Sequence, residues 1–296
     1  MDKVVIIGGS GFMGSHTADI LSDSNYEVVI YDEIESPWIR DDQKMVLGDI
    51  LDRNHLRETI KGSRYIYHFA GVADIDDADN NPYQSLNINI MGTATTLEAI
   101  VREKNVERFI FASSMYVNSP YGSFYRASKQ ASEIIIEVYA EKFGIDYTLL
   151  RYGSLYGPRS QTWNTLYRYI DQVLREKKLT FWGTGNEKRE YIHVRDAAKL
   201  SVEVLNSEYK NQAITITGNQ ILTSNELIEM IFEISGIEKN VDYSNRNVIS
   251  GHYQLTPYRY TPRKAKKLIS NEFTDIGQGI IDLIEAIDIK NDSGKT

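Results

Sequence analysis

The chain has no cysteine among its 296 residues. That absence excludes disulfide bonds, a thiolate nucleophile and cysteine-ligated zinc, and we expect no metal site. No apolar stretch approaches the roughly 20 residues that a membrane-spanning helix needs. We also expect no signal peptide, because only three residues precede a four-residue apolar run and a glycine. We therefore expect a cytoplasmic protein that does not contact membranes.

The chain also has fewer positively than negatively charged residues. The formal net charge is −8, with 33 lysines and arginines against 41 aspartates and glutamates. Such an excess of negative charge argues against nucleic acid or an anionic membrane as a partner. Apolar residues make up 42% of the chain and charged residues 25%. These proportions are typical of a globular protein, and the length suggests one or two domains with an ample core.

A glycine triplet near the start is the strongest pattern that is present. Gly8, Gly11 and Gly14 directly follow the apolar run 4–7, and residues 12–22 have the character of a helix. A short apolar run ended by glycine is typical of a buried parallel strand. Glycines in the turn let the backbone approach a pyrophosphate, which then lies at the positive end of the helix. The pattern predicts a dinucleotide-binding βαβ unit.

Asp32 follows the second apolar run, 28–31, and lies 18 residues beyond Gly14. A carboxylate at that place accepts hydrogen bonds from both hydroxyls of an adenosine ribose. It would also repel the 2′-phosphate of NADP. We therefore expect NAD as the cofactor.

Strands and helices alternate beyond this unit. Further strands are expected at 44–48, 64–70, 108–112 and 146–151, and further helices at 53–60, 83–104, 128–143, 164–177 and 224–235, with a polar loop at 71–81. Such alternation predicts an α/β fold, a doubly wound parallel sheet of the Rossmann type. We expect an NAD-binding domain over 1–152, with a later contribution near 190–207. A smaller, interwoven substrate-binding lobe would take most of 153–296.

Tyr125 and Lys129 are four residues apart, near the start of the helix after the fifth strand. That spacing puts both side chains on one helix face. A phenol with a pKa of about 10 is a poor base, but an ammonium one turn away and an oxidised nicotinamide would stabilise the phenolate. Ser114 lies at the carboxyl end of the fifth strand, where open α/β sheets bind ligands, and could bridge the substrate hydroxyl and the phenol. We expect Ser114, Tyr125 and Lys129 to be catalytic.

With these features the chain resembles an extended short-chain dehydrogenase/reductase, in the NAD-dependent nucleotide-sugar epimerase/dehydratase family, of the UDP-glucose 4-epimerase type. The matching stretches follow the order of the family: 8–14, 65–71, 89–93, 111–114, 125–129, 151–159 and 189–196. In relatives, the helices corresponding to 83–104 and 128–143 pair across a two-fold axis. The resemblance therefore implies a homodimer as well as a nucleotide-diphosphate sugar substrate.

The resemblance also implies particular ligand contacts. Asp49 and Ile50 would contact adenine, Lys129 would also hold the nicotinamide ribose, and Asn89 would steady the active-site helix. The expected NAD contacts are Gly8, Gly11, Phe12, Met13, Gly14, Asp32, Asp49, Ile50, Ala70, Gly71, Asn89, Tyr125, Lys129 and Tyr152. The expected substrate contacts are Ser154, Arg159, Arg189 and Arg259.

Among the substrate contacts, Arg189 is the best candidate for the diphosphate, since a guanidinium matches phosphate oxygens. We expect His193 to be a structural hydrogen-bonding residue rather than a base. The basic cluster between 259 and 267 is most simply a solvated helix face, from which Arg259 could still reach the phosphates.

Several positions depart from the family pattern. Ser154 replaces a common asparagine, the loop 118–124 is shorter than in relatives, and an aspartate of the family's tail is not recognisable near 260–262. Met115 and Tyr116 stand where 4,6-dehydratases of the family carry an Asp-Glu pair. Neither residue acts as a general acid or base at neutral pH. A 4,6-dehydratase is therefore disfavoured.

The reaction that remains is oxidation at a sugar carbinol, most often C4. If the keto sugar is reduced on its other face, the net reaction is 4-epimerisation. We rank this reaction first because of its frequency in the family. If the keto sugar leaves, the protein is a 4-dehydrogenase, or in reverse a 4-ketoreductase. A non-catalytic NAD-binding regulatory protein is a further alternative, and retention of all three expected catalytic residues argues against it.

Overall fold

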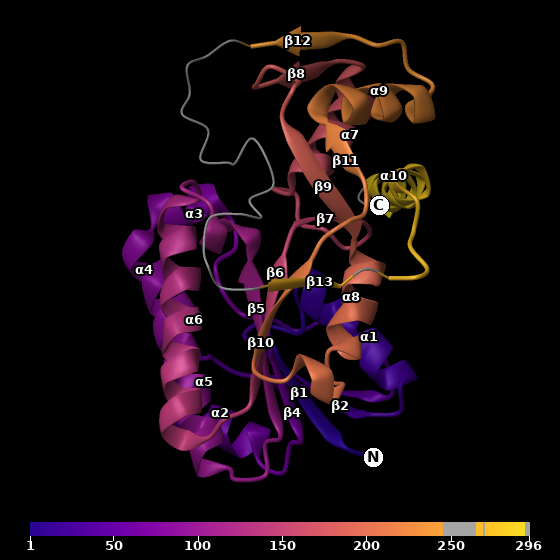
Figure 1. Ribbon diagram of the computed structural model, residues 1–296. Helices are drawn as coiled ribbons and strands as arrows, with labels where there is room; N and C mark the ends of the chain where they lie inside the picture. The colour runs from indigo at the N-terminus through magenta and orange to yellow at the C-terminus, as the bar shows by residue number, and fades with distance from the viewer. Residues whose placement is uncertain (245–264, 269, 294–296) are drawn as a thin grey trace.

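The computed structural model describes residues 1–244, 265–268 and 270–293. Its main feature is an eight-stranded sheet whose neighbouring strands are all parallel (Figure 1). In order across the sheet the strands are β13 (Ala265–Leu268), β10 (Gln212–Ile216), β6 (Tyr147–Tyr152), β5 (Arg108–Ser114), β4 (Tyr65–His68), β1 (Lys3–Ile7), β2 (Glu27–Asp32) and β3 (Gln43–Leu47). Strand order reverses between β1 and β4, which creates the switch point where open α/β sheets bind ligands. The predicted fold class is confirmed.

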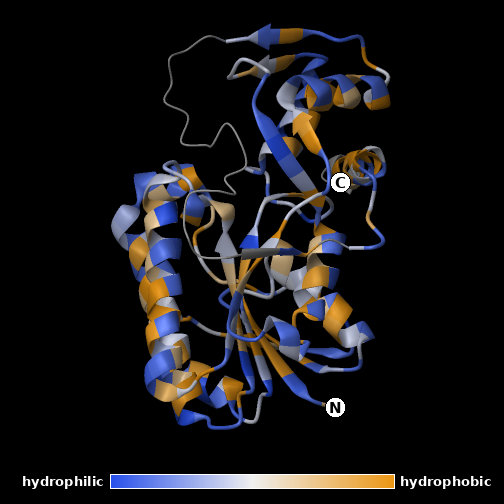
Figure 2. Ribbon diagram, viewed as in Figure 1, coloured by the Kyte–Doolittle hydropathy of each residue, from blue (hydrophilic) through white to orange (hydrophobic). Residues whose placement is uncertain are grey.

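Helices cover both faces of this sheet (Figure 1). One face carries α1 (Phe12–Asp23) and α8 (Val194–Glu203), and the other carries α2 (Arg53–Ile60), α5 (Gly92–Arg102) and α6 (Ser123–Phe143). Alternate residues of β1 enter the two cores: Val4 and Ile6 pack on one side, Val5 and Ile7 on the other. Figure 2 shows these strands as an apolar band between more polar helices. Burial on both faces explains why the strands are continuous apolar runs in the sequence.

Short helices lie among the connections of the sheet. They are α3 (Ile75–Asn80), α4 (Pro82–Leu86), the π-helix η1 (Asn87–Met91), and the 3-10 helices η2 (Met115–Asn118) and η3 (Ser207–Tyr209). The expected loop 71–81 therefore contains a helix, which begins where the Asp74 carboxylate accepts the N–H of Asp76 at 3.0 Å. The expected helix 83–104 corresponds to α4, η1 and α5 (Gly92–Arg102), which follow one another without a break and include a π turn. Such turns often mark functional sites.

A second, smaller lobe lies beyond the carboxyl ends of the central strands (Figure 1). It contains a three-stranded sheet of β11 (Ile221–Thr223), β9 (Lys188–His193) and β7 (Ser154–Tyr156), and a pair of β12 (Val241–Tyr243) and β8 (Leu179–Phe181). Its helices are α7 (Thr165–Glu176), α9 (Ser224–Ser235) and α10 (Ile276–Ser293), which share an apolar core. Within the described residues, none of the helices has both the length and the apolar character needed to cross a membrane.

The chain passes between the two lobes several times. It leaves the central sheet after Tyr152, and it returns with α8, with β10 and finally with β13. The later contribution to the sheet is thus longer than the segment 190–207 that the sequence suggested. Lys266 and Lys267 belong to β13, so this part of the basic cluster is a strand and not the expected helix face.

Candidate active site

A cavity of about 640 Å³ opens at the carboxyl ends of the central strands, against the second lobe. One part of its wall comes from the turn after β1 and from the ends of β2, β4, β5 and β6. The other part comes from β7, α7 and β9. The cavity is therefore shared by both lobes, and both are needed to close it.

The glycine turn after β1 brings the backbone close to this cavity. Gly8 has a φ of +83°, and a Cβ there would lie 2.3 Å from the amide nitrogen of Ala70. A Cβ on Gly14 would lie 2.2 Å from the carbonyl oxygen of Gly8. Gly11 is the N-cap of α1, and no described side chain caps that end of the helix. The turn is thus a tight backbone cradle at a positive helix end, which fits a pyrophosphate.

Asp32 closes the next part of the wall. Its carboxylate accepts hydrogen bonds from the N–H of Ser10 at 2.9 Å and from the N–H of Ile34 at 3.2 Å. These bonds fix the carboxylate at the end of β2 while oxygen lone pairs remain for a ligand. The arrangement fits a ribose diol.

Asp49 and Ile50 follow β3 and line the same end of the cavity. The Tyr31 hydroxyl donates to the Asp49 carbonyl at 2.8 Å, and the N–H of Leu51 donates to the Asp49 carboxylate at 2.8 Å. Burial raises the pKa of Tyr31 to about 12, so this hydroxyl keeps its proton and its hydrogen bond. The loop after β3 is therefore held in a fixed position beside the Asp32 site.

Asn89, in the π turn, connects three elements around the cavity. Its amide side chain accepts from the N–H of Val72 at 2.8 Å, and donates to the Val72 carbonyl at 3.0 Å and to the Ser128 hydroxyl at 2.9 Å. Its carbonyl accepts from Thr93 at 2.6 Å and from Ser132 at 3.1 Å. Gly71, with a φ of +152°, would place a Cβ 2.7 Å from the Asn89 amide oxygen. Asn89 therefore holds the loop after β4 against α6.

Ser114, Tyr125 and Lys129 all line the cavity. Lys129 is almost fully buried; its Nζ donates to the Ala112 carbonyl at 2.8 Å and lies 5.9 Å from the Tyr125 ring centre. Burial lowers the pKa of this ammonium to about 8. Ser114 is the last residue of β5, and its hydroxyl accepts the N–H of Tyr116 at 3.3 Å. The structure thus brings the three expected catalytic residues together.

The two positions after Ser114 carry no carboxylate. Met115 is buried, whereas Tyr116 lines the cavity. The Tyr116 ring meets the Tyr125 ring edge to face, with centres 6.0 Å apart. Gly122, at a φ of +98°, lies so close that a Cβ would be 2.5 Å from the Tyr116 ring. The short loop 118–124 therefore packs directly on Tyr116, which becomes a wall of the site beside Tyr125.

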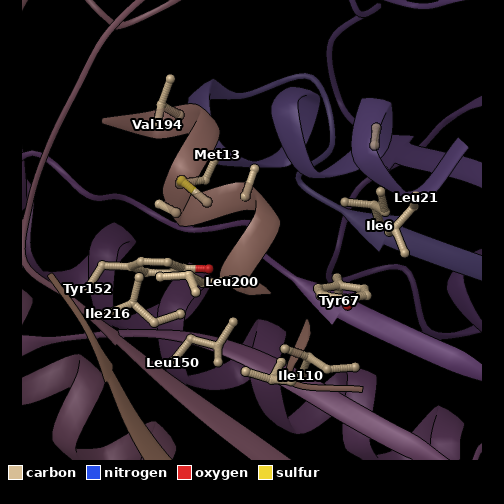
Figure 3. Packing of buried hydrophobic residues seen from close by; sticks show 14 of the residues in the cluster. Ile6, Met13, Leu21, Tyr67, Ile110, Leu150, Tyr152, Val194, Leu200 and Ile216 are labelled. Atoms are coloured by element: carbon tan, nitrogen blue, oxygen red, sulfur yellow. The ribbon is translucent and has the colours of Figure 1, made fainter. Parts of the chain in front are cut away.

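Tyr152 reaches the cavity only in part. Its hydroxyl shares a 2.6 Å hydrogen bond with Ser201 on α8, and burial raises its pKa above the usual range. Figure 3 shows the ring packed among core residues that include Leu200 and Ile216. The Tyr152 hydroxyl is therefore engaged with α8, although the residue also lines the cavity.

The expected substrate residues separate into three groups. Ser154 and Arg189 line the cavity. Arg159 does not: it pairs with Asp19 on α1 at 2.8 Å and lies over the Trp38 ring at 5.0 Å, so its guanidinium is used between elements of the fold. The expectation that Arg159 meets the substrate is not supported by this geometry. Arg259 lies outside the described residues.

Arg168 was missed from the sequence, yet it lines the cavity from α7. No family motif surrounds it, and only the fold of the second lobe brings it to the same cavity as Ser154 and Arg189. Asn164 also lines the wall; it caps α7 through the N–H of Leu166 at 3.1 Å and donates to the Leu155 carbonyl at 3.0 Å. His193 behaves as expected, as a structural group: its Nδ1 accepts the N–H of Arg195 at the start of α8.

Comparison with known proteins agrees with this architecture. The model of the NAD dependent epimerase/dehydratase family matches residues 4–217. A protein of Methanocaldococcus jannaschii, provisionally named UDP-glucose 4-epimerase, is 31% identical over 254 residues, which are 77% of this chain and 81% of the relative. A dTDP-glucose 4,6-dehydratase of Mycobacterium tuberculosis is 26% identical over 218 residues, 66% of each chain.

Among solved structures, the fold is similar to that of a UDP-glucuronic acid 4-epimerase from Bacillus cereus in complex with UDP-glucuronic acid and NAD. The TM-score is 0.83 at 24% identity, and the match covers 97% of this chain and 99% of the other. The chain belongs to the NAD dependent epimerase/dehydratase family. NAD is its cofactor, as the sequence predicted.

Proposed function

We propose that this protein is an NAD-dependent 4-epimerase of a nucleotide-diphosphate sugar, with a UDP-hexose as the substrate class. One observation carries the proposal: Ser114, Tyr125 and Lys129 share a cavity with the glycine cradle and with side chains of a second lobe. The substrate class is supported by a relative at 31% identity that bears the name of a UDP-glucose 4-epimerase.

In this proposal the glycine turn holds the NAD pyrophosphate, Asp32 accepts both hydroxyls of the adenosine ribose, and Asp49 with Ile50 borders the adenine. The rest of the cofactor wall consists of Phe12, Met13, Ala70, Gly71 and Tyr152. Lys129 donates to the nicotinamide ribose. A 2′-phosphate would meet the Asp32 carboxylate and be repelled.

Bound NAD supplies the hydride acceptor and, in the second half of the reaction, the hydride donor. Tyr125 takes the proton of the C4 hydroxyl as that carbon is oxidised, and Ser114 orients the same hydroxyl. The Lys129 ammonium stabilises the Tyr125 phenolate. After the keto sugar has turned over, Tyr125 returns a proton to the C4 oxygen. The net result is inversion at C4.

At the other end of the cavity we assign the diphosphate to Arg189 and Arg168. Both arginines line the cavity, and an arginine carries the positive charge that a diphosphate requires. Ser154 donates to the same region of the substrate. The assignment leaves Arg159 outside the site because of its pairing with Asp19.

We infer that 4,6-dehydration is not the reaction, although one relative bears the name of a 4,6-dehydratase. The inference rests on the residues after Ser114, where Met115 is buried and Tyr116 presents an aromatic ring. Elimination of water across C5 and C6 needs an acid and a base beside the sugar, and neither residue supplies them at neutral pH.

The experiment uses UDP-glucose, UDP-N-acetylglucosamine and UDP-glucuronic acid, each deuterated at C4. Deuterium recovered at C4 of the inverted sugar, without net NADH, is the expected result. Stoichiometric deuterated NADH with a 4-keto sugar would instead make the protein a dehydrogenase. A Tyr125→Phe control and unlabelled substrate exclude activity of a contaminant, and inactivity on every sugar would favour a regulatory protein.

We also propose a homodimer built on α5 and α6. Ile134 and Val138 on α6 are both 51% exposed, and Met91, the residue before α5, is 45% exposed. Ala127, Ala131, Ile134 and Val138 follow the four–three–four spacing of a helix-packing seam. Light scattering should give twice the 33.9 kDa of one chain, and Ile134→Lys should give single chains. A monomeric wild type would contradict the proposal. The cytoplasmic location stays a prediction from the sequence.

A further inference from the structure

A buried polar network lies next to the candidate catalytic residues and joins three elements. Glu133 on α6 and Arg151 on β6 are 2% and 1% exposed. Arg151 donates to Glu133 through Nε at 3.0 Å and through Nη2 at 2.7 Å. The hydroxyl of Ser113, on β5, donates to the same carboxylate at 2.5 Å. Both carboxylate oxygens of Glu133 are therefore held by fixed donors.

The network is connected along the chain to two of the three catalytic candidates, Ser114 and Lys129. Ser113 precedes Ser114 and is paired in register with Arg151 on the neighbouring strand. Glu133 lies one turn after Lys129 on α6. Lys129 in turn donates to the carbonyl of Ala112, the residue before Ser113. A shift of α6 against β5 would thus break the Glu133 bonds and move Lys129 away from Ser114.

Packing alone does not explain this network. Removing two charges from water is costly, and apolar residues of similar volume often fill such a place with equal or greater stability. The surrounding core offers apolar solutions, since Phe109, Phe111 and Leu149 lie in it on the same side of the sheet. A buried ion pair at this position therefore points to a task that requires charge or fixed geometry.

The charge of Glu133 acts on Lys129. Burial lowers the Lys129 pKa to about 8, and the Glu133 carboxylate opposes that effect. Among the described residues, Tyr125 on the same helix has its ring centre 5.9 Å from the Lys129 Nζ, and His68 on β4 feels the Lys129 charge, whereas Arg151 is paired with Glu133. His68 is neutral at physiological pH, because burial and the Lys129 charge lower its pKa to about 3. Glu133 is thus the anion that favours the charged form of Lys129.

We propose that Glu133, held by Arg151 and Ser113, is a positioning residue that fixes Lys129 beside Ser114 and keeps the Lys129 ammonium charged during the reaction. This inference rests on the proposed function for its catalytic consequence. Its electrostatic part concerns Lys129 and NADH alone, so it can be tested without any sugar substrate.

The test compares wild type with Glu133→Gln, with Glu133→Gln/Arg151→Met and with Glu141→Gln. The double variant removes both buried charges, so it avoids the unpaired Arg151 that could unfold the single variant. Glu141→Gln is the matched control, because it makes the same change on an exposed turn of α6. NADH affinity is measured by fluorescence from pH 6 to 10, since the ribose loses a charged donor when Lys129 is deprotonated.

In wild type and Glu141→Gln we expect affinity to fall around pH 8. In Glu133→Gln the pH midpoint of this fall in NADH affinity should lie about one pH unit lower than in wild type. In the double variant the midpoint should move in the same direction. The decrease of kcat at alkaline pH should shift to lower pH by a similar amount. Unchanged midpoints in the folded double variant, with only a lower Tm, would overturn the inference. A shifted NADH midpoint in a protein that inverts no sugar would overturn the proposed function instead.

Discussion

The two walls of the cavity are constructed by different means. On the cofactor side, the backbone does most of the positioning: Gly8 and Gly14 leave no room for a Cβ, and Asp32 is fixed by one N–H of the glycine turn and one N–H of its own turn. On the substrate side, Ser154, Arg168 and Arg189 come from three separate elements of the second lobe. Local sequence thus builds one wall, whereas tertiary packing builds the other. The cofactor wall should tolerate few substitutions, and the substrate wall should be adjusted one side chain at a time.

The largest expected effect lies where the two walls meet. Tyr125→Phe removes the proposed base and keeps the ring against Tyr116. Turnover should fall by roughly 10²–10⁴-fold, the usual contribution of a positioned acid or base. NAD affinity should hardly change, because the ring and its packing remain. Single-turnover kinetics with a UDP-hexose measure the first quantity and calorimetry the second; near-normal turnover would show that another group is the base.

On the cofactor wall, Asp32→Ala should weaken NAD binding by about 10- to 100-fold, since two hydrogen bonds to a charged acceptor are lost. The preference for NAD over NADP should shrink at the same time. Turnover at saturating NAD should be retained. Calorimetry with both cofactors tests this, and Glu35→Ala on the exposed loop nearby is the control. Equal affinity of wild type for NAD and NADP would contradict the assignment.

The free energy of unfolding should also decrease in acid, because two histidines are buried in the domain that carries the cofactor wall. Burial lowers the pKa of His68 to about 3 and that of His16 to about 4. Both values lie below that of an unfolded histidine, about 6.5, so the unfolded chain binds more protons and stability falls as pH drops below about 6.5. Each of these two histidines should lower the free energy of unfolding by about 2 kcal/mol at pH 5.

Urea unfolding of wild type and His68→Leu at pH 7 and pH 5 measures this loss. About half of the wild-type decrease between these pH values should disappear in the variant. His55→Gln, an exposed histidine of α2, serves as the control. An unchanged pH dependence in His68→Leu would show that this ring is not the acid-sensitive group.

The smallest effect on activity is expected from substitutions in the substrate wall, where three arginines can be compared. Arg189→Ala and Arg168→Ala should each raise KM for the nucleotide sugar by about 10-fold, the loss of one charge-assisted contact. Arg159→Ala should leave KM unchanged and lower Tm slightly, because that guanidinium pairs with Asp19. A raised KM in Arg159→Ala alone would reverse the assignment.

Predictions from the sequence were accurate where a pattern is local. The helix expected at 53–60 is α2, and that at 224–235 is α9, which Thr223 caps by accepting the N–H of Glu226. The predictions missed β10 and β13, which pair with distant strands. They also missed the small strands of the second lobe. Three-residue strands such as β8 and β11 carry too little periodicity to be distinguished from loops.

The sequence by itself determined the cofactor and the family. A strand, a glycine turn, a helix and an acid lie within 32 residues, and Tyr125 and Lys129 are one helical turn apart, so these groups meet without help from the rest of the chain. Only the tertiary structure decided which arginines face the cavity. The family stretch 151–159 favoured Arg159 and no motif indicated Arg168, but Arg159 pairs with Asp19 whereas α7 places Arg168 in the cavity wall. The physical reason is distance along the chain: local contacts follow from spacing, whereas contacts between separate elements depend on the packing of the entire molecule.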